Sequence, residues 1–497
     1  MKAGSAPLLL GVDQGTTRTK ACIVDRDGRA VALAAREVPA RYPRPGWVEQ
    51  DPLDLLRTVL ETAREALVLA DAPVVAMGLA NQGETVVAWD VRTGLPIAPA
   101  IGWQDRRTEA LCHELEEQGM ASLVRARTGL PIDPYFSATK IRWILDQVPA
   151  ARVLAARGDL RVGTSDAWLL WSLTGRYRTD DSTASRTMLY NPRTRDWDQQ
   201  ILDALQIPRA ILPEIRPSRS HFGTVPAGLL GYDVPLTASL VDQQAALFGQ
   251  ACHRLGSAKV TYGTGAFLLV NTGREMPVSA HGLLPTVAWS TERDLTFALD
   301  GGIYVAGAAV QWLRDGLGII EDVAETAALA MSVPDSGGVV VVPALAGLAA
   351  PYWDSAARGT ILGLSRGTTR AHIVRATLEG IAFRTRDVLD AMVRDTGLSI
   401  SQIKVDGGAS ANPFLMRCLA ELLEREVVTA ASTEATAIGA AQQACVQAGV
   451  WPDEAAVAAL WRAGTLYVPS GDTRLRRAYD DWLRAVDLAR RWGSGER

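Results

Sequence analysis

Two distant segments of the 497-residue chain share one plan, and this repeat constrains the fold more than any other feature. Residues 7–14 (PLLLGVDQ) and 21–24 (ACIV) are apolar runs separated by GTTRTK. Such a pattern predicts a β-hairpin whose loop is rich in Gly and hydroxyl groups. Residues 258–270 (AKVTYGTGAFLLV) repeat the strand, the Gly/Thr loop and the second strand. We therefore predict an internally duplicated α/β protein.

The length of the chain predicts more than one domain, because a single hydrophobic core rarely extends over so many residues. We place the division near residue 250, with an N-terminal domain over 1–250 and a C-terminal domain over 251–497. Helical periodicity separates the predicted strands. Residues 51–69 begin with an Asp cap and a Pro, and residues 473–492 carry apolar side chains along one face. Both stretches are predicted to be amphipathic helices.

Composition excludes several classes of partner. Hydrophobic residues make up 48% of the chain and the net charge is −4, so we expect neither a nucleic-acid partner nor a charged membrane surface. The N-terminus does not resemble a signal peptide, and the apolar runs are too short for a membrane span, so we expect a cytoplasmic protein. The five cysteines are scattered, which is typical of reduced thiols buried in the core. The five histidines show no metal-ligand spacing.

The first predicted loop has the chemistry of a metal–phosphate site. Gly15 allows the backbone to turn tightly and present N–H groups to an anion, and Thr16 and Thr17 add hydroxyl donors. Asp13 could hold Mg²⁺ beside a phosphate, with Lys20 as a nearby cation. Taken alone, the same residues could also form an ordinary β-turn.

Two further loops support the phosphate interpretation. The second hairpin carries Thr264 and Gly265, and a third apolar strand runs into Asp406-Gly407-Gly408. A glycine pair allows a flat ring or a phosphate to approach the backbone closely. The GxxxxGK[ST] and early GxGxxG motifs are absent from the sequence, which argues against P-loop and dinucleotide folds. We therefore predict that the three loops, which lie in both halves of the chain, bind a nucleotide in a cleft between domains.

These loops, together with longer stretches between them, resemble the FGGY carbohydrate kinase family over nearly the whole chain. They are most similar to the members that phosphorylate glycerol. The longer stretches are YPRPGWVEQDP (42–52), WQDRRT (103–108), GLPIDPYFSATK (129–140), ASRTMLYN (184–191), DQQAALFGQ (242–250), GAAVQWLRD (307–315), APYWD (350–354) and GTILGLSRGTTRAHIVRATLE (359–379). The resemblance implies two actin-like (ribonuclease H-like) domains duplicated around an ATP cleft. The duplication read from the hairpins agrees with this fold.

The resemblance also assigns roles to residues. It implies that Asp242 is the catalytic base, and that Asp13 and Asp242 position Mg²⁺. The acceptor would contact Gly83, Glu84, Trp103, Tyr135, Asp242, Gln243 and Phe267. ATP would contact Asp13, Gln14, Gly15, Thr16, Thr17, Lys20, Thr264, Gly307, Gln311, Gly408 and Asn412.

Three departures from the family pattern bear on specificity and control. Gly83 stands where the glycerol-phosphorylating members carry an Arg that binds glycerol, and either Arg106 or Arg186 could supply the missing charge. Lys20 also replaces an Arg, and loses its bidentate fork. Residues 224–239 contain no Lys or Arg, where some bacterial members have a cationic loop. A bisphosphate needs cationic partners, so we expect no regulation by fructose 1,6-bisphosphate.

The resemblance implies ATP-dependent phosphorylation of a terminal hydroxyl of glycerol, which yields sn-glycerol 3-phosphate and ADP. Because of Gly83, a larger polyol or a ketose such as a tetritol, a pentitol or xylulose remains an alternative acceptor. A non-kinase actin-like ATPase or sensor is a further alternative. The family also implies a homodimer or homotetramer.

Overall fold

The computed structural model describes residues 7–495, which form two compact units. The first unit comprises the chain up to His253 together with Thr286–Phe297 and Ala435–Trp461. The second comprises Arg254–Pro285, Ala298–Glu434 and the chain from Arg462 onward. The chain therefore passes between the units several times. The sequence predicted one boundary near residue 250, and that division stays a prediction.

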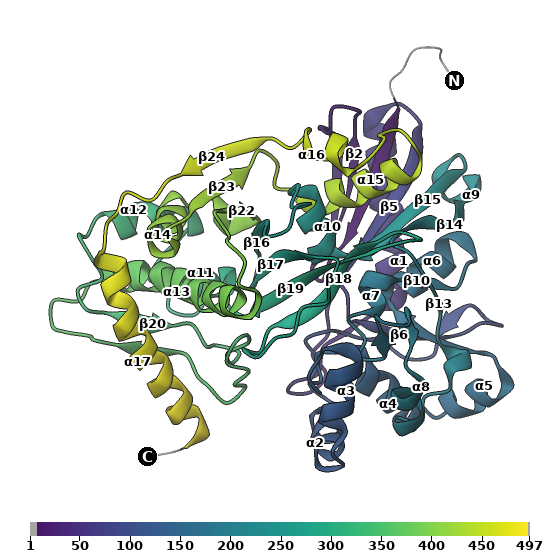
Figure 1. Cartoon of the computed structure of the whole chain (residues 1–497), viewed down its shortest axis with the longest axis horizontal. Helices are drawn as coiled ribbons and strands as arrows, with labels where there is room; N and C mark the ends of the chain where they lie inside the picture. Colours follow the sequence, from purple (N-terminus) through teal and green to yellow (C-terminus); the bar gives the residue numbers. More distant parts are fainter. Residues whose placement is uncertain (1–6, 496–497) are drawn as a thin grey trace. The chain divides into compact units, whose positions relative to one another are not determined.

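A six-stranded sheet forms the centre of the first unit (Figure 1). Its strands, in spatial order, are β14 (Arg219–Val225), β15 (Val234–Val241), β5 (Val74–Asn81), β1 (Leu8–Gln14), β2 (Arg18–Val24) and β3 (Ala30–Glu37). Strands β1 and β2 are antiparallel, as the first hairpin predicted. Strands β1, β5 and β15 run parallel to one another. The carboxyl ends of these three strands therefore lie at the same edge of the sheet.

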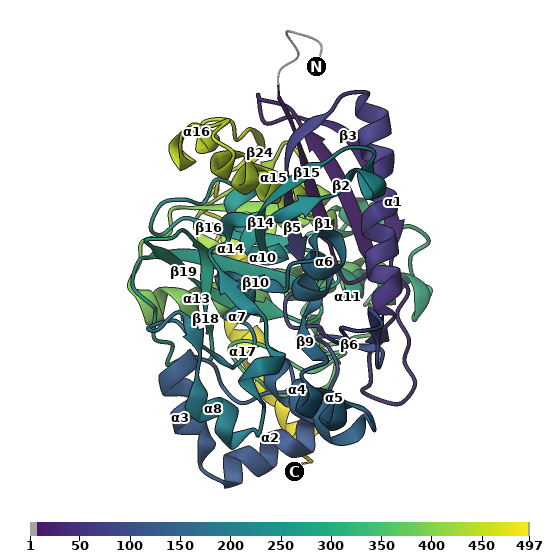
Figure 2. The same cartoon turned by 90° about the vertical axis from the view of Figure 1, so that its right-hand side faces the viewer.

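Two helices cover opposite faces of this sheet. Helix α1 (Pro52–Ala70) packs along β2 and β3 (Figure 2), and Asp51 caps it by accepting a hydrogen bond from the Leu53 N–H, as predicted. Its apolar side chains share a core with Leu10 and Val12. Gly11, which points to the other face, lies against helix α15 (Ala435–Gln447) so closely that a Cβ there would be 1.9 Å from the Ala437 oxygen. A small residue at this position lets the helix sit directly on the sheet.

A smaller sheet and several helices complete the first unit. The sheet contains β4 (Glu49–Gln50), β8 (Ala100–Ile101), β6 (Val86–Asp90), β7 (Leu95–Pro96) and β9 (Leu160–Thr164). The principal helices are α2 (Glu109–Glu117), α3 (Met120–Thr128), α4 (Ser137–Gln147), α5 (Ala151–Arg157), α6 (Ser165–Thr174), α7 (Asp181–Ala184), α8 (Gln199–Ala204), α9 (Ala227–Leu230), α10 (Asp242–Gly249) and α16 (Glu454–Ala458). Short pieces are β10 (Arg178–Asp180), β11 (Tyr190–Asn191), β12 (Asp196–Trp197), η1 (Arg209–Ile211) and β13 (Glu214–Arg216).

The sheet of the second unit repeats the strand pattern of the first. Its neighbouring strands are β19 (Leu295–Ile303), β17 (Ala266–Gly273), β16 (Ala258–Tyr262), β22 (Gln402–Asp406), β23 (Glu426–Ala430) and β24 (Ala463–Tyr467), and β18 (Leu284–Ser290) precedes β19 in the chain. Strands β16 and β17 form an antiparallel hairpin, β16, β22 and β23 run parallel, and β24 is antiparallel to β23. The same sequence of pairings relates β2, β1, β5, β15 and β14. The predicted internal duplication is therefore visible in the topology.

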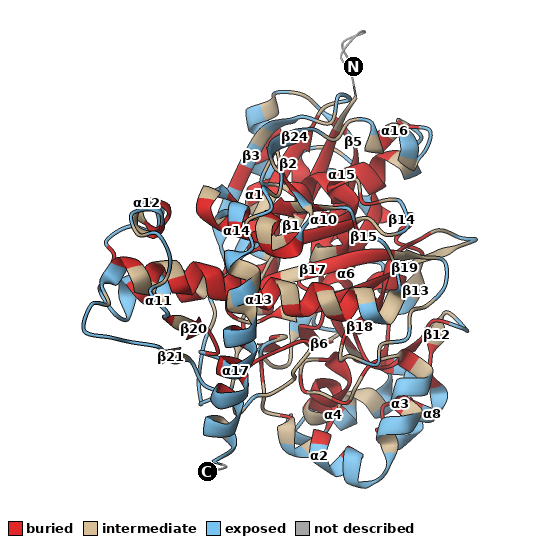
Figure 3. Ribbon diagram, turned by 60° about the vertical axis from the view of Figure 1, so that its left-hand side comes forward, coloured by how far each residue is buried: buried red, intermediate tan, exposed pale blue. Residues whose placement is uncertain are grey.

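Helices of the second unit enclose a separate core. The long helix α13 (Arg370–Thr396) is largely buried, whereas α17 (Arg474–Ser494) exposes its outer face (Figure 3). Trp482, Val486 and Ala489 of α17 are buried, which confirms the predicted packing face. The other elements are α11 (Gly307–Asp315), η2 (Val323–Glu325), α12 (Thr326–Met331), β20 (Val340–Val342), β21 (Thr360–Leu362), η3 (Gly408–Ala411) and α14 (Pro413–Leu423).

Two global predictions can be checked against the described residues. All five cysteines are buried, as expected of small core side chains. Between residues 7 and 495, every helix is too short or too polar to cross a bilayer.

Candidate active site

Strand register brings three of the predicted segments together in the first unit. Gln14, the last residue of β1, lies opposite Asn81 of β5, and Asn81 lies opposite Val241 of β15. The phosphate loop at 15–17, the turn at 82–85 and Asp242 directly follow these three positions. The carboxyl edge of a parallel sheet is where α/β proteins bind ligands. The sequence-predicted residues therefore share an edge suited to a site.

The phosphate loop is a tight turn between β1 and β2. Asp13 lies directly opposite Lys20 in the antiparallel pair. The Gly15 N–H donates to the Arg18 carbonyl at 3.1 Å, which closes the turn. Thr16 is half-buried and Thr17 is exposed. The turn thus holds one carboxylate, one amine and two hydroxyl groups within a few residues.

Asp242 is the first residue of α10, immediately after the buried end of β15. Its Oδ1 accepts a hydrogen bond from the Gln243 N–H at 2.6 Å. The positive end of the helix dipole stabilises a negative charge at this position. Because Asp242 is half-buried, its carboxylate is both held in place and accessible, as a proton acceptor requires.

The turn after β5 contains Gly83 and Glu84. Gly83 has φ +70°, and its N–H donates to the Asn81 side-chain oxygen at 2.9 Å. A Cβ at Gly83 would lie 3.4 Å from Cγ1 of Val241. A side chain at position 83 would therefore start beside the residue that precedes Asp242. Glu84 is buried, with 4% of its surface exposed.

Two aromatic residues stand beside this turn. The ring of Trp103 meets Tyr135 edge-on, with 5.7 Å between ring centroids. Both residues are half-buried, so part of each remains accessible. Paired aromatic surfaces can cover the carbon chain of a polyol while polar neighbours bind its hydroxyl groups.

The structure decides which arginine lies near Glu84. Arg186 is buried, and its Nε donates to the Glu84 carboxylate at 2.6 Å. Arg106 instead pairs with Glu109 at 2.5 Å, and 35% of its side chain is exposed. Arg186, one of the two arginines considered from the sequence, therefore contacts the predicted acceptor residue Glu84. Nothing in the local sequence indicated this contact, because 102 positions separate the two residues.

Lys140 is a second buried cation that sequence reasoning did not assign to the site. Its ammonium group donates to the Tyr135 carbonyl at 2.7 Å and to the Glu84 carbonyl at 3.4 Å. Burial lowers its pKa to about 8, although the carboxylates of Glu84 and Asp105 oppose the shift. The signal that could have identified Lys140 is its position on α4, where it lies four residues from Ile144 on a buried helix face.

A chain of buried amides links the turn at 82–85 to the loop at 15–17, which are predicted to bind the acceptor and phosphate. The Gln82 Nε2 donates to the Oε1 of Gln50 at 2.9 Å and to the Oε1 of Gln14 at 3.2 Å. Gln50 in turn donates to the Thr16 carbonyl at 2.7 Å. All three glutamines are at least 97% buried. Gln50 and Gln82 were absent from the predicted site because amide pairing across strands leaves no local pattern.

In the second unit, the loop at Thr264 packs against the start of α11. The Gly307 N–H donates to the Gly263 carbonyl at 3.1 Å, and the Ala308 N–H donates to the Thr264 carbonyl at 3.0 Å. A Cβ at Gly307 would be 2.4 Å from the Gly263 oxygen, so only glycine permits this approach. Gln311 is exposed one turn further along α11. Loop and helix thus form one surface that includes Thr264, Gly307 and Gln311.

The third predicted loop follows β22, which lies beside β16. Gly407 has φ +84°, and a Cβ there would be 2.3 Å from the Tyr262 oxygen. Gly408 is exposed. Asn412 caps α14 by accepting hydrogen bonds from Phe414 and Leu415, and donates to the Thr326 hydroxyl at 3.0 Å. Its amide is therefore engaged in the fold, and contact with adenosine stays a prediction.

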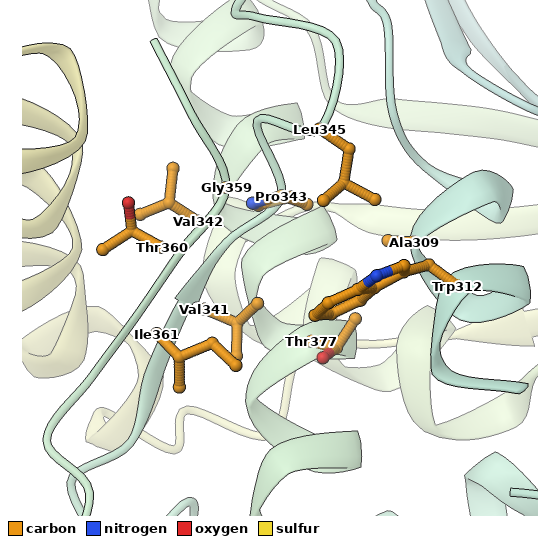
Figure 4. Close-up of a pocket in the computed structure, with 10 residues that line it drawn as sticks. All are labelled: Ala309, Trp312, Val341, Val342, Pro343, Leu345, Gly359, Thr360, Ile361 and Thr377. Carbon is orange, nitrogen blue, oxygen red and sulfur yellow. The ribbon is translucent and has the colours of Figure 1, made fainter. Parts of the chain in front are cut away.

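The second unit also contains the predicted acceptor residue Phe267 and an apolar cavity. Phe267 is half-buried on β17, opposite Thr261 of β16. A largely apolar cavity of about 180 Å³ lies between α11, α13 and the β20–β21 hairpin (Figure 4). It is lined by Ala309, Trp312, Val341, Val342, Pro343, Leu345, Gly359, Thr360, Ile361 and Thr377. Neither Gly307 nor Gln311 lines it, and the lining carries no charge, so it is unsuited to a phosphate.

Proteins of known family resemble this chain over nearly its whole length. A glycerol kinase from Polaromonas naphthalenivorans is 51% identical over 488 residues, which cover 96% of this chain and 98% of that protein. The crystal structure of Plasmodium falciparum glycerol kinase with ADP matches with a TM-score of 0.91 and 32% identity over 98% of this chain and 99% of that one. A xylulose kinase from Lactobacillus acidophilus shares the fold (TM-score 0.87) at 22% identity over 97% and 98% of the two chains.

The family models match most of the chain. The N-terminal domain of the FGGY family of carbohydrate kinases matches residues 8–249, and the C-terminal domain matches residues 258–448. These matches confirm the resemblance seen in the sequence and the two-domain α/β fold that it implied. The chain belongs to the FGGY family of carbohydrate kinases and is an ATP-dependent phosphotransferase that acts on an alcohol group.

Proposed function

We propose that this enzyme transfers the γ-phosphoryl group of ATP to a terminal hydroxyl of glycerol, which yields sn-glycerol 3-phosphate and ADP. The observation that carries the proposal is the convergence of Asp242, the Glu84 turn and the phosphate loop at one edge of the first sheet. A base, a group that binds hydroxyls and a loop that binds phosphate are the parts that this reaction needs. The glycerol kinases among the relatives support glycerol as the acceptor.

In this mechanism Asp242 accepts the proton of the attacking hydroxyl. The hydroxyl oxygen then forms a bond to the γ-phosphorus, while the bond from that phosphorus to the β–γ bridging oxygen breaks and ADP leaves. The Gln243 N–H, which donates to Oδ1 of Asp242 at 2.6 Å, holds the carboxylate in one orientation. Glu84, Tyr135 and Trp103 orient the acceptor, with Gln243 and Phe267 as further proposed contacts.

The remaining predicted residues are proposed to hold the nucleotide. In the first unit, Gln14, Gly15, Thr16, Thr17 and Lys20 would contact phosphates. In the second unit, Thr264, Gly307 and Gln311 would contact phosphates and ribose, and Gly408 and Asn412 the adenosine. Asp13 would hold Mg²⁺, and Asp242 would lie near it. One or two carboxylates suffice, because Mg²⁺ keeps several waters and binds substrate phosphates. When bound, the ion spreads the negative charge that develops on the phosphoryl group.

The alternatives from the sequence are less well supported. A larger polyol or a ketose was suggested by the missing side chain at Gly83, but Arg186 already places a guanidinium against Glu84. The acceptor turn and its aromatic pair also argue against a mere ATPase, which needs no acceptor pocket, and a sensor would show no ADP release stimulated by a polyol. Cytoplasmic location and a homodimer or homotetramer stay predictions, and light scattering on the purified protein tests the oligomeric state.

The decisive experiment measures ADP formation from ATP with glycerol, erythritol, ribitol, xylitol and xylulose. We expect the highest kcat/KM with glycerol, and a fall in kcat of roughly 10²- to 10⁴-fold in Asp242→Asn because the general base is lost. Asp198→Asn is the matched control, since Asp198 is a buried helix cap of α8. The proposal is wrong if glycerol does not stimulate ADP formation, or if Asp242→Asn and Asp198→Asn retain equal turnover.

A further inference from the structure

Arg186 touches two of the proposed acceptor residues at once. Its Nε donates to Oε1 of Glu84 at 2.6 Å, and its Nη2 donates to the Tyr135 hydroxyl at 3.3 Å. The guanidinium carbon also lies 5.6 Å from the centre of the Tyr135 ring. Glu84 belongs to the turn after β5 and Tyr135 precedes α4. One side chain therefore joins two separate segments of the acceptor site.

The backbone around Arg186 is fixed to the same sheet edge. Asp180 caps α7 by accepting hydrogen bonds from the Ser182 and Thr183 N–H groups. The Asn81 amide donates to the Thr183 hydroxyl at 3.0 Å, and the Arg186 N–H donates to the Thr183 carbonyl at 3.0 Å. These bonds tie the segment that carries Arg186 to the end of β5. The guanidinium is thus aimed at the site by a rigid support.

The contacts define what each acceptor residue can do. Glu84 is 4% exposed, and a buried carboxylate is stable when a cation pairs with it. Paired in this way, Glu84 acts as a hydrogen-bond acceptor. The Tyr135 hydroxyl already accepts a hydrogen bond from Arg186, so it donates its own proton to another partner. A ligand that satisfies both must offer a hydroxyl donor to Glu84 and an oxygen lone pair to Tyr135.

We infer that Arg186 is a positioning residue that sets acceptor specificity through Glu84 and Tyr135. This inference rests on the proposed function and extends it: Arg186 makes the site selective for a triol over a diol that lacks the middle hydroxyl. With one terminal hydroxyl placed at Asp242, glycerol has two hydroxyls left to bond Glu84 and Tyr135, whereas 1,3-propanediol has only one. Gly83 contributes no side chain to this recognition, so the guanidinium of Arg186 carries it.

A purely structural role for Arg186 makes different predictions, and a matched control separates the two. Arg384 forms a comparable buried pair with Asp387 at 2.9 Å, with 2% of each side chain exposed. That pair lies in the second unit, where Arg384 also donates to the Ala350 carbonyl at 2.7 Å. Both Arg186→Met and Arg384→Met leave a buried carboxylate without its cation. Both variants should therefore lose stability, but only Arg186→Met should change the acceptor selectivity.

The experiment compares wild type, Arg186→Met, Arg186→Lys and Arg384→Met. It measures the melting temperature, KM for ATP, and kcat/KM for glycerol and 1,3-propanediol. In Arg186→Met we expect KM for glycerol to rise about 10- to 100-fold, the loss typical of one hydrogen bond to a charged group. KM for ATP should stay within about twofold, and the preference for glycerol over 1,3-propanediol should fall. Arg186→Lys should recover part of the preference, because it keeps the charge without the fork.

The outcomes distinguish this inference from the proposed function. If wild type phosphorylates none of the polyols, the proposed function is wrong and this inference falls with it. If wild type is active and Arg186→Met keeps its preference for glycerol, or raises KM for glycerol and KM for ATP equally, only this inference is wrong. Should Arg186→Met fail to fold, Arg186→Lys and Tyr135→Phe decide the question. Both must then lower the preference for glycerol, and an unchanged preference in both overturns the inference.

Discussion

The indole nitrogen of Trp103 donates a hydrogen bond to the Thr16 hydroxyl at 2.8 Å. Trp103 belongs to the proposed acceptor site, and Thr16 to the loop proposed to hold phosphate. The backbone N–H of Trp103 donates a second hydrogen bond, to the Thr85 hydroxyl at 3.2 Å, and Thr85 is next to Glu84. One residue is thus bonded both to the acceptor turn and to the phosphate loop. The two substrates should therefore influence each other's binding through Trp103.

Trp103→Phe tests this coupling, because it keeps an aromatic ring and removes the indole donor. We expect KM to rise for glycerol and for ATP together by about 2- to 10-fold, the usual worth of one neutral hydrogen bond. Trp197→Phe is the control, since the Trp197 indole donates to the Pro213 carbonyl at 2.9 Å in a buried structural position. Steady-state kinetics with both substrates varied give the values. A rise confined to glycerol would contradict the coupling.

The buried amides of Gln50 and Gln82 form a second connection between the same two segments. We expect glycerol to tighten ADP binding, and we expect Gln50→Met and Gln82→Met each to reduce that tightening. The effects should be non-additive by about 0.5–3 kcal/mol, because the two side chains share a hydrogen bond. Titration calorimetry of ADP with and without glycerol measures the coupling in both single variants and the double variant.

Gln443→Met is the control for these two variants. Gln443 is buried in α15, and its amide atoms have no hydrogen-bond partner within the described residues 7–495. Replacement of such an amide by an apolar side chain should be neutral or stabilising. If Gln443→Met weakened the coupling as much as Gln82→Met does, the connection through Gln50 and Gln82 would be refuted.

Gly83→Arg probes the position that departs from the family pattern. The φ of +70° at Gly83 makes any other residue cost roughly 1–2 kcal/mol. The new side chain would start beside Val241, next to Asp242. We expect a loss of stability together with a stronger preference for glycerol over erythritol and xylitol, since the added guanidinium fills the space available to longer polyols.

Gly158→Arg separates the backbone effect from the effect on the site. Gly158 has φ +77°, and a Cβ there would meet no atom within 4 Å. Both variants should lose similar stability in denaturant unfolding, but only Gly83→Arg should change the ranking of acceptors. An unchanged ranking in Gly83→Arg would show that position 83 does not shape the acceptor site.

The hairpins and the loops at their ends could be predicted from the sequence because their signals are local. The alternating and continuous apolar runs before Gly15 and Gly265 specify strands and turns within about fifteen residues. The parallel register that brings Gln14, Asn81 and Val241 to one sheet edge depends on distant strands, since the paired residues Asn81 and Val241 are 160 positions apart in the chain. The family resemblance predicted which residues belong to the site, but it did not predict this strand register.

The contacts that sequence reasoning missed are long-range contacts of buried polar groups. Arg186 meets Glu84 across 102 positions, and Gln82 meets Gln14 across 68. Such partners have no fixed spacing, since their proximity depends on how whole strands and helices pack. The return of α15 to the first unit is a similar case. Its glycine and alanine pattern indicates close packing, but not the sheet on which it packs.

The buried Lys140 gives the enzyme a specific dependence of stability on pH. Its pKa is lowered from the usual 10.5 of a lysine to about 8 in the folded protein. Between these values the unfolded chain binds more protons than the folded one, so this group makes folding more favourable as pH rises. The gain is on the order of 3 kcal/mol between pH 8 and 10.5. Glu84, Asp105, Asp133 and Cys112 are the titratable groups that face Lys140.

Lys140→Met isolates this contribution, because it removes the titrating amine and keeps the length of the side chain. The unfolding free energy of wild type minus that of Lys140→Met should increase as pH is raised from 7.5 to 10 in urea titrations, and should be flat below about pH 7. At neutral pH the variant should be as stable as wild type or more so, since it avoids the burial of a charge. A difference that stays constant or decreases above pH 8 would show that Lys140 keeps an ordinary pKa beneath the acceptor site.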